Sequence, residues 1–265
     1  MLKSLTLLEL PVSPFPLTSM GAPLLRADFR WETAGFSLKS MKSQRPYDKI
    51  LAMGKGDRLQ RRKWDGTAYE PDPLLWAQLE GEVPEEICHK ALVNYDHVQG
   101  FLLPFLNQTF QILPKTRSID PLYAHAPKFK SFELDLIILT YLLRAQAVDL
   151  SGKMINEKQV PGGETFFRGP HSLNTRPMEK LFGEDKKGFL SAGKRLNGRV
   201  RKLGDAAICL PVFPRVPVTL ILWEKDDEFP AEIKVNFDST VSRHLPLDII
   251  WALINVVSKW MTLSV

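Results

Sequence analysis

Alternating apolar and polar positions near the C-terminal end of the sequence predict a β-hairpin followed by a helix. Residues 216–223 are apolar on both sides of the alternation, which is typical of an interior strand covered on each face. Residues 231–238 alternate strictly between apolar and polar, which predicts one packed face and one solvated face. Apolar residues with the helical period then continue to Trp260, after Leu245 and Pro246, and predict a helix lying on the sheet.

The preceding part of the sequence predicts further helices and short strands. One predicted helix begins at Pro84, and a second runs from the capping residue Ser131 to about Ala147. A third covers residues 175–183, and a less regular fourth covers residues 184–203. The predicted strands cover residues 101–106, 109–113 and 205–210, with a turn at Asn107 and Gln108 joining the first two. These elements indicate an α+β fold, with a small, mostly antiparallel sheet packed against several helices.

Residues 1–72 differ from the rest of the sequence. They are rich in proline and serine, sustain no apolar period, and end near the basic run Arg58–Lys63. We therefore expect a poorly ordered basic extension before a single domain over residues 73–265. Met53 is an alternative start of translation, which leaves open whether residues 1–52 belong to the native protein.

Charge, cysteine content and the length of the apolar runs indicate which classes of protein are compatible with the sequence. The net charge of +5 is concentrated in two segments, because residues 42–63 hold eight Lys or Arg against two acids, and residues 184–204 hold seven against two. Cys88 and Cys209 belong to no CxxC pair, which argues against a disulfide scaffold. No apolar run is long enough for a bilayer, so we expect a cytoplasmic protein without a membrane partner.

Several segments together resemble a known but uncharacterised family. The segments are Tyr95-Asp96, Leu103–Leu106, Leu139–Leu142, Pro161–Arg168, Leu222–Ala231, Phe237-Asp238 and Leu245-Pro246. Over roughly residues 76–260 the chain resembles the domain-of-unknown-function family DUF number 3786 of anaerobic bacteria and archaea. The resemblance implies no activity, but some members are joined to a four-cysteine iron–sulfur module of corrinoid and electron-transfer proteins. This chain departs from that arrangement, because residues 1–72 contain no cysteine.

The glycine-rich segment supplies the candidate ligand site. Bare backbone amides followed by arginine suit a phosphate or carboxylate group. The candidate ligand-binding residues are Gly162, Gly163, Arg168, His171 and Arg176, together with Trp223 on the predicted hairpin. The alternative is a tight loop whose glycines serve backbone geometry and whose Arg168 pairs with Glu164.

Two charged clusters carry weaker candidates. The acidic residues Glu224, Asp226, Asp227, Glu228 and Asp238 suit a hard cation, but a solvated hairpin turn is the favoured explanation and no metal site is expected. The basic residues Lys194, Arg195, Arg199 and Arg201 suit an acidic protein or, less favoured, a nucleic acid. A solvated helix face is the alternative for the basic run.

The sequence contains no complete catalytic, nucleotide or cofactor motif, so whether the protein is an enzyme stays open and its cofactor is unknown. We expect a small-ligand or cofactor-binding accessory protein of anaerobic redox or corrinoid-linked metabolism. The alternative is an interaction module that uses the basic segment 184–204.

Overall fold

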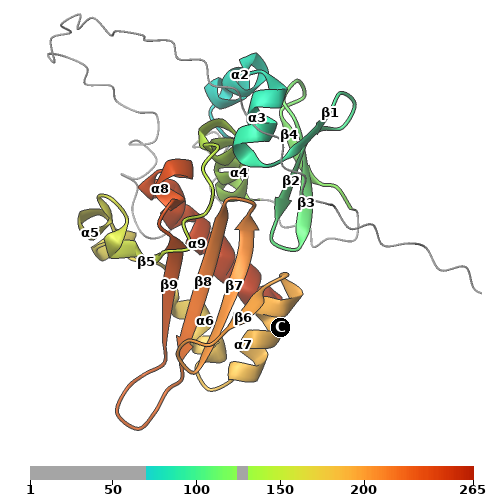
Figure 1. Ribbon diagram of the computed structural model, residues 1–265. Coiled ribbons are helices and arrows are strands. Elements are labelled where there is room, and N and C mark those ends of the chain that lie inside the picture. Colours follow the sequence, from blue (N-terminus) through green and yellow to red (C-terminus); the bar gives the residue numbers. More distant parts are fainter. Residues whose placement is uncertain (1–69, 124–130) are drawn as a thin grey trace, which may run out of the picture. The chain divides into compact units, whose positions relative to one another are not determined.

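The computed structural model describes residues 70–123 and 131–265 (Figure 1). These residues belong to one structural unit, residues 45–265. The expected extension over residues 1–72 and the alternative start at Met53 lie outside the described residues, apart from residues 70–72. Within the described ranges, no helix has the length and apolar character needed to cross a membrane.

The described ranges contain eight α-helices, two short 3-10 helices and nine strands. The α-helices are α2 (Pro73–Gly81), α3 (Pro84–Ala91), α4 (Phe132–Arg144), α5 (Gly163–Phe166), α6 (Arg176–Phe182), α7 (Lys186–Arg195), α8 (Val241–His244) and α9 (Leu247–Leu263). The 3-10 helices are η1 (Glu157–Gln159) and η2 (Gly169–His171). The strands are β1 (Asn94–Asp96), β2 (Gly100–Phe105), β3 (Gln108–Leu113), β4 (Ser118–Pro121), β5 (Met154–Asn156), β6 (Arg199–Arg201), β7 (Ala206–Phe213), β8 (Val216–Trp223) and β9 (Glu232–Asp238).

The strands form two antiparallel sheets, which confirms the α+β class but divides the expected single sheet. One sheet has the order β1-β2-β3-β4 and the other has the order β5-β9-β8-β7-β6. The predicted hairpin is confirmed as β8 and β9, and β8 lies at the centre of the larger sheet, as its two apolar faces indicate. The predicted helix after the hairpin is confirmed as α9, which runs behind that sheet in Figure 1.

The turn between β2 and β3 joins the small sheet to the large one. It consists of Leu106 and Asn107, because Gln108 already pairs with Phe105, so the predicted turn was wrong by one residue. Leu106 adopts a φ of 55°, and its N–H donates to the carbonyl oxygens of Pro211 and Val212 at 3.2 and 3.3 Å. These acceptors lie where the β7–β8 register shifts. The irregular stretch of β7 thus receives the turn of the small sheet.

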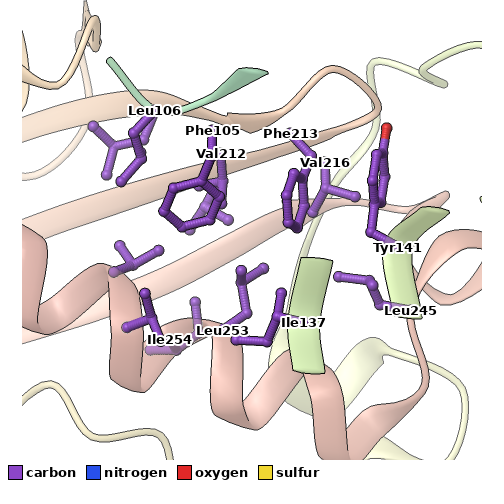
Figure 2. Packing of buried hydrophobic residues seen from close by; sticks show 14 of the residues in the cluster. Phe105, Leu106, Ile137, Tyr141, Val212, Phe213, Val216, Leu245, Leu253 and Ile254 are labelled. Atoms are coloured by element: carbon purple, nitrogen blue, oxygen red, sulfur yellow. The ribbon is translucent and has the colours of Figure 1, made fainter. Parts of the chain in front are cut away.

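Helices α4 and α9 supply much of the apolar core beneath this junction. Figure 2 shows Ile137 of α4 and Leu253 and Ile254 of α9 on the side that faces Phe105 and Phe213. Phe105 belongs to β2 of the small sheet, and Phe213 belongs to β7 of the large sheet. The Ser131 hydroxyl accepts a hydrogen bond from the backbone of Leu134, which confirms the predicted cap of α4. The helix ends at Arg144, before the predicted Ala147, because Ala145 takes an extended ψ of 141°.

The basic segment 184–203 is a helix only in its first half. Helix α7 ends at Arg195, and Asn197 then takes a φ of 61°. Strand β6 follows and forms the edge of the large sheet next to β7. A Cβ at Gly198 would lie 2.6 Å from the carbonyl oxygen of Gly193, so the turn that ends the helix requires glycine at residue 198.

Arg215, in the tight turn between β7 and β8, is buried with a relative exposure of 6%. Its guanidinium donates to the carbonyl oxygens of Lys90 and Val148, both at 2.7 Å, and of His89 at 3.2 Å. The Tyr141 hydroxyl accepts from the Arg215 backbone N–H at 3.2 Å and donates to the Ala91 carbonyl at 2.8 Å. One side chain and its turn therefore hold the end of α3, the segment after α4 and the β7–β8 turn together.

We predict that Arg215→Ala lowers the free energy of unfolding by roughly 3 kcal/mol, because three partly buried carbonyl oxygens lose their charged donor. Arg215→Lys should recover only part of this loss, since one ammonium group cannot reproduce the planar fork of donors. Urea unfolding measures both values. Arg168→Ala is the matched control, because that arginine pairs only at the surface and should change stability by less than about 1 kcal/mol. Equal effects of the Arg215 and Arg168 variants would contradict the role of Arg215.

Candidate functional site

The glycine-rich loop, residues 160–171, lies near the start of α9. Gly162 has a φ of 77°, and a Cβ there would lie 3.2 Å from the Leu247 side chain. At Gly163 a Cβ would lie 2.0 Å from the carbonyl oxygen of Glu157. The close approach of the Glu157 backbone is therefore enough by itself to require glycine at residue 163.

The polar side chains of this loop have partners within the loop or beside it. Arg168 donates to Glu164 at 3.2 Å, and both side chains are exposed. The His171 ring stacks on Phe166 with centroids 4.7 Å apart and meets the edge of Trp251 at 6.1 Å. The pairing that we weighed as an alternative to ligand binding is thus present in the structure.

The other two predicted ligand residues lie elsewhere. Arg176 begins α6 and lines a cavity of about 550 Å³, which Lys225 also lines. The lining of this cavity includes acidic as well as basic side chains. Trp223, at the end of β8, is 46% exposed and is not among the residues lining this cavity. The structure therefore places Gly162, Gly163, Arg168 and His171 together in one loop and brings neither Arg176 nor Trp223 into the cavity described below.

The acidic hairpin loop is organised by its own turn and by lysines. The Asp226 carboxylate accepts the backbone N–H groups of Glu228 and Phe229 at 2.9 and 2.6 Å. Lys225 pairs with Glu184 at 3.0 Å, and Lys186 pairs with Glu224 at 3.1 Å. Asp227 is exposed in the same loop. Within the described ranges, no three His, Cys, Asp or Glu side chains gather as metal ligands.

The predicted partner-binding residues divide between α7 and β6. Lys194 and Arg195 close α7, and Arg195 donates to the carbonyl oxygen of Ser264 at 2.5 Å. Arg199 and Arg201 are exposed on β6, two residues apart and so on the same side of the strand. These two arginines form a basic edge of the larger sheet.

A second cavity, of about 670 Å³, was not predicted from the sequence. The end of α3, the segment after α4, and α8 with Pro246 form its walls. We call it the His244 cavity. Its titratable lining residues are all bases: His89, Lys90, Arg144, Arg243 and His244. Because no aspartate or glutamate lines it, the cavity presents hydrogen-bond donors with positive charge.

His244 is the buried residue of this cavity, with a relative exposure of 1%. Its Nδ1 accepts the backbone N–H of Gln146 at 3.3 Å, which places the proton of the neutral ring on Nε2. Nε2 is enclosed and has no hydrogen-bond partner among the residues that the structure describes. Burial, then the positive charges of Arg215 and Arg243, lower the pKa of His244 to about 4, although Asp238 acts against them. The imidazole is therefore neutral at neutral pH.

Asp238, shortly before α8, holds the segment around Ser151 and the residue that precedes α8, Thr240. Its carboxylate accepts hydrogen bonds from the backbone and hydroxyl groups of Ser151 and Thr240 and from the backbone of Gly152. Burial raises the pKa of Asp238, but the hydrogen bonds from Thr240 and Ser151 outweigh it and leave the pKa below its ordinary value. These protein donors occupy the carboxylate that we considered as a cation ligand.

Few features of the sequence pointed to the His244 cavity. Arg243 and His244 form a basic pair directly before the family-like Leu245-Pro246, but basic residues at a helix end commonly just satisfy the last carbonyls. Arg144 also closes a helix, and it is separated from this pair by about a hundred residues of sequence. Only the meeting of the two helix ends in space makes them a site.

We predict that protonation of His244 destabilises the fold as the pH falls from about 6.5 to about 4. The pKa is lowered on folding, so the unfolded chain binds the proton first, and stability present above pH 6.5 is lost through this window. The loss should approach roughly 3 kcal/mol. Asp238 contributes little in this window, because its stabilisation is lost mainly as the pH falls below its ordinary pKa of 3.8.

Urea unfolding at a series of pH values measures this loss. His244→Asn keeps an acceptor for the backbone of Gln146 but cannot titrate, so its stability should change much less between pH 6.5 and pH 4. His97→Asn, at an exposed position, should keep the pH dependence of the wild-type protein. An unchanged slope in His244→Asn would show that His244 is not the titrating group.

Comparison with known proteins places the described unit in a family. No curated protein and no solved structure matches the chain. The family described as Domain of unknown function (DUF3786) matches residues 83–260, which include every residue that lines the His244 cavity. This match confirms the resemblance seen in the sequence. The chain therefore belongs to the DUF3786 family.

Proposed function

We propose that the protein binds a small ligand in the His244 cavity. The observation that carries this proposal is the buried Nε2–H group of His244, a residue that lines an open cavity. Within the described part of the chain, this group has no hydrogen-bond acceptor. A buried donor without a partner costs about 1–3 kcal/mol, and such groups in native proteins call for a specific explanation. A ligand that enters the cavity and displaces a neighbouring side chain would supply the acceptor.

The dimensions of the cavity support this proposal. Its volume of about 670 Å³ falls in the range of small-molecule sites. Its walls come from segments that two side chains hold in place. The buried Arg215 side chain donates hydrogen bonds to two of these segments, and the Asp238 carboxylate accepts several hydrogen bonds beside a third. The cavity is therefore built on fixed backbone, which keeps its shape before a ligand arrives.

The glycine-rich loop is less suited to the same role. Arg168 already pairs with Glu164, and His171 is stacked on Phe166. A ligand at the loop would have to replace these contacts. We retain the broader expectation of an accessory protein in anaerobic redox or corrinoid-linked metabolism, located in the cytoplasm, as a prediction, and we propose no reaction.

A second candidate function is binding of an acidic protein through the basic edge. Its specific support is that all three residues of β6 are exposed at the edge of the larger sheet, with Arg199 and Arg201 on one side. Short, charged edge strands also protect sheets from unwanted pairing, which explains the same arrangement without a partner. The cavity therefore remains the better supported site.

We predict that Ala147→Trp abolishes ligand binding, because Ala147 lies exposed in the wall of the His244 cavity and an indole there fills it. Leu181→Trp is the matched control, since Leu181 is an exposed residue of the other cavity. Native mass spectrometry and absorption spectra of protein purified without oxygen measure any ligand that co-purifies. A thermal-shift screen of small metabolites finds ligands that dissociate during purification.

The wild-type protein and Leu181→Trp should carry or bind the same ligand, and Ala147→Trp should not. A ligand that Ala147→Trp still binds would reject the His244 cavity as its site. If no compound binds the wild-type protein, while Arg199→Glu with Arg201→Glu removes salt-sensitive binding of an acidic protein, the second candidate replaces the first.

A further inference from the structure

We infer that the ligand of the His244 cavity carries a small oxyanion group, a carboxylate or a phosphate, bound by Arg144 and Arg243. This inference rests on the proposed function and specifies its ligand class. Every titratable side chain that lines the cavity is a base, and the buried imidazole of His244 carries an N–H group without an acceptor among the described residues. A ligand that matches these groups must be rich in acceptors and negatively charged.

The two arginines retain unused donors. Arg144 is exposed and has no hydrogen bond or ion pair within the described part of the chain. Arg243 donates through Nε to the Gln146 side chain at 3.0 Å, and its terminal nitrogens make no hydrogen bond to any described residue. The contact with Gln146 orients the guanidinium and leaves its outer edge for a ligand. Arginine suits this role because its planar donors match the oxygen atoms of carboxylate and phosphate groups.

Within the described part of the chain, no aspartate or glutamate forms an ion pair with Arg144 or Arg243. Glu86 pairs with Lys90 at 3.1 Å, and Asp238, which keeps its negative charge, accepts hydrogen bonds from Ser151, Gly152 and Thr240. Asp149 is fully exposed and lies 3.7 Å from the Arg215 guanidinium. The positive charge of Arg144 and Arg243 thus remains for a ligand.

The other cavity provides an internal comparison. Its lining includes Arg176, Lys180 and Lys225, but also the acids Glu179, Glu184 and Asp185. Glu184 accepts from Lys225, and Glu179 accepts hydrogen bonds from Thr175 and Ile233. Opposite charges meet within that cavity, whereas the His244 cavity holds one sign only. An anion therefore discriminates between the two cavities.

Isothermal titration calorimetry of the full chain tests the inference, with inorganic phosphate and acetate as probes and uncharged acetamide as the control. We expect Arg144→Gln and Arg243→Gln each to weaken binding of the preferred anion about tenfold, because each removes a charge-assisted donor. Arg243→Lys should lose less, and Arg176→Gln, which removes the same charge at the other cavity, should bind normally. Added potassium chloride should weaken binding.

The outcomes separate the ligand class from the site. Stronger binding of phosphate than acetate identifies a phosphate group, and the reverse identifies a carboxylate. Anion binding that Arg144→Gln and Arg243→Gln leave unchanged overturns the inference, as does the absence of anion binding to the wild-type protein. If a neutral compound binds the wild-type protein and Ala147→Trp removes it, the cavity is a ligand site and only the anion class fails. If Ala147→Trp removes nothing, the proposed function fails as well.

Discussion

The guanidinium of Arg215 is the buried charge around which the described unit is assembled. Its donors satisfy the carbonyl oxygens of His89, Lys90 and Val148, and its own backbone is held by Tyr141. Burying a charge is unfavourable unless such partners are complete, so the β7–β8 turn is stable only where α3 and the segment after α4 also arrive. The same contacts fix two walls of the His244 cavity, which makes the proposed site a consequence of how the fold satisfies this one side chain.

Local periodicity predicted the helices and strands whose buried faces appear as a regular apolar pattern in the sequence. The hairpin β8–β9 and helix α9 follow from patterns that burial imposes directly, and the capping residue Ser131 follows from its hydroxyl. Strand β6 was missed because its three residues are all exposed, so no alternation marks it. The junction of the two sheets depends on Leu106 donating to β7, a contact between residues about a hundred positions apart that composition does not reveal.

The candidate site also depends on contacts between residues that are far apart in the sequence. Glycine and arginine in one loop drew attention because they are adjacent in sequence, yet Gly163 is explained by its approach to Glu157 and Arg168 by its pairing with Glu164. Arg144 and Arg243 carry no motif, since each stands at the end of its own helix. Their significance lies in sharing one cavity without an opposing acid, which only tertiary structure shows.

The proposed oxyanion site of the His244 cavity lies between Arg144 and Arg243. Soaking a crystal of the protein in selenate is the sharpest test of this site, because selenate resembles phosphate in shape and charge and selenium scatters anomalously. We expect an anomalous peak in the cavity, within hydrogen-bond distance of both guanidinium groups. Anomalous peaks found only elsewhere, such as along Arg199 and Arg201 on β6, with solvent in the cavity, would contradict it.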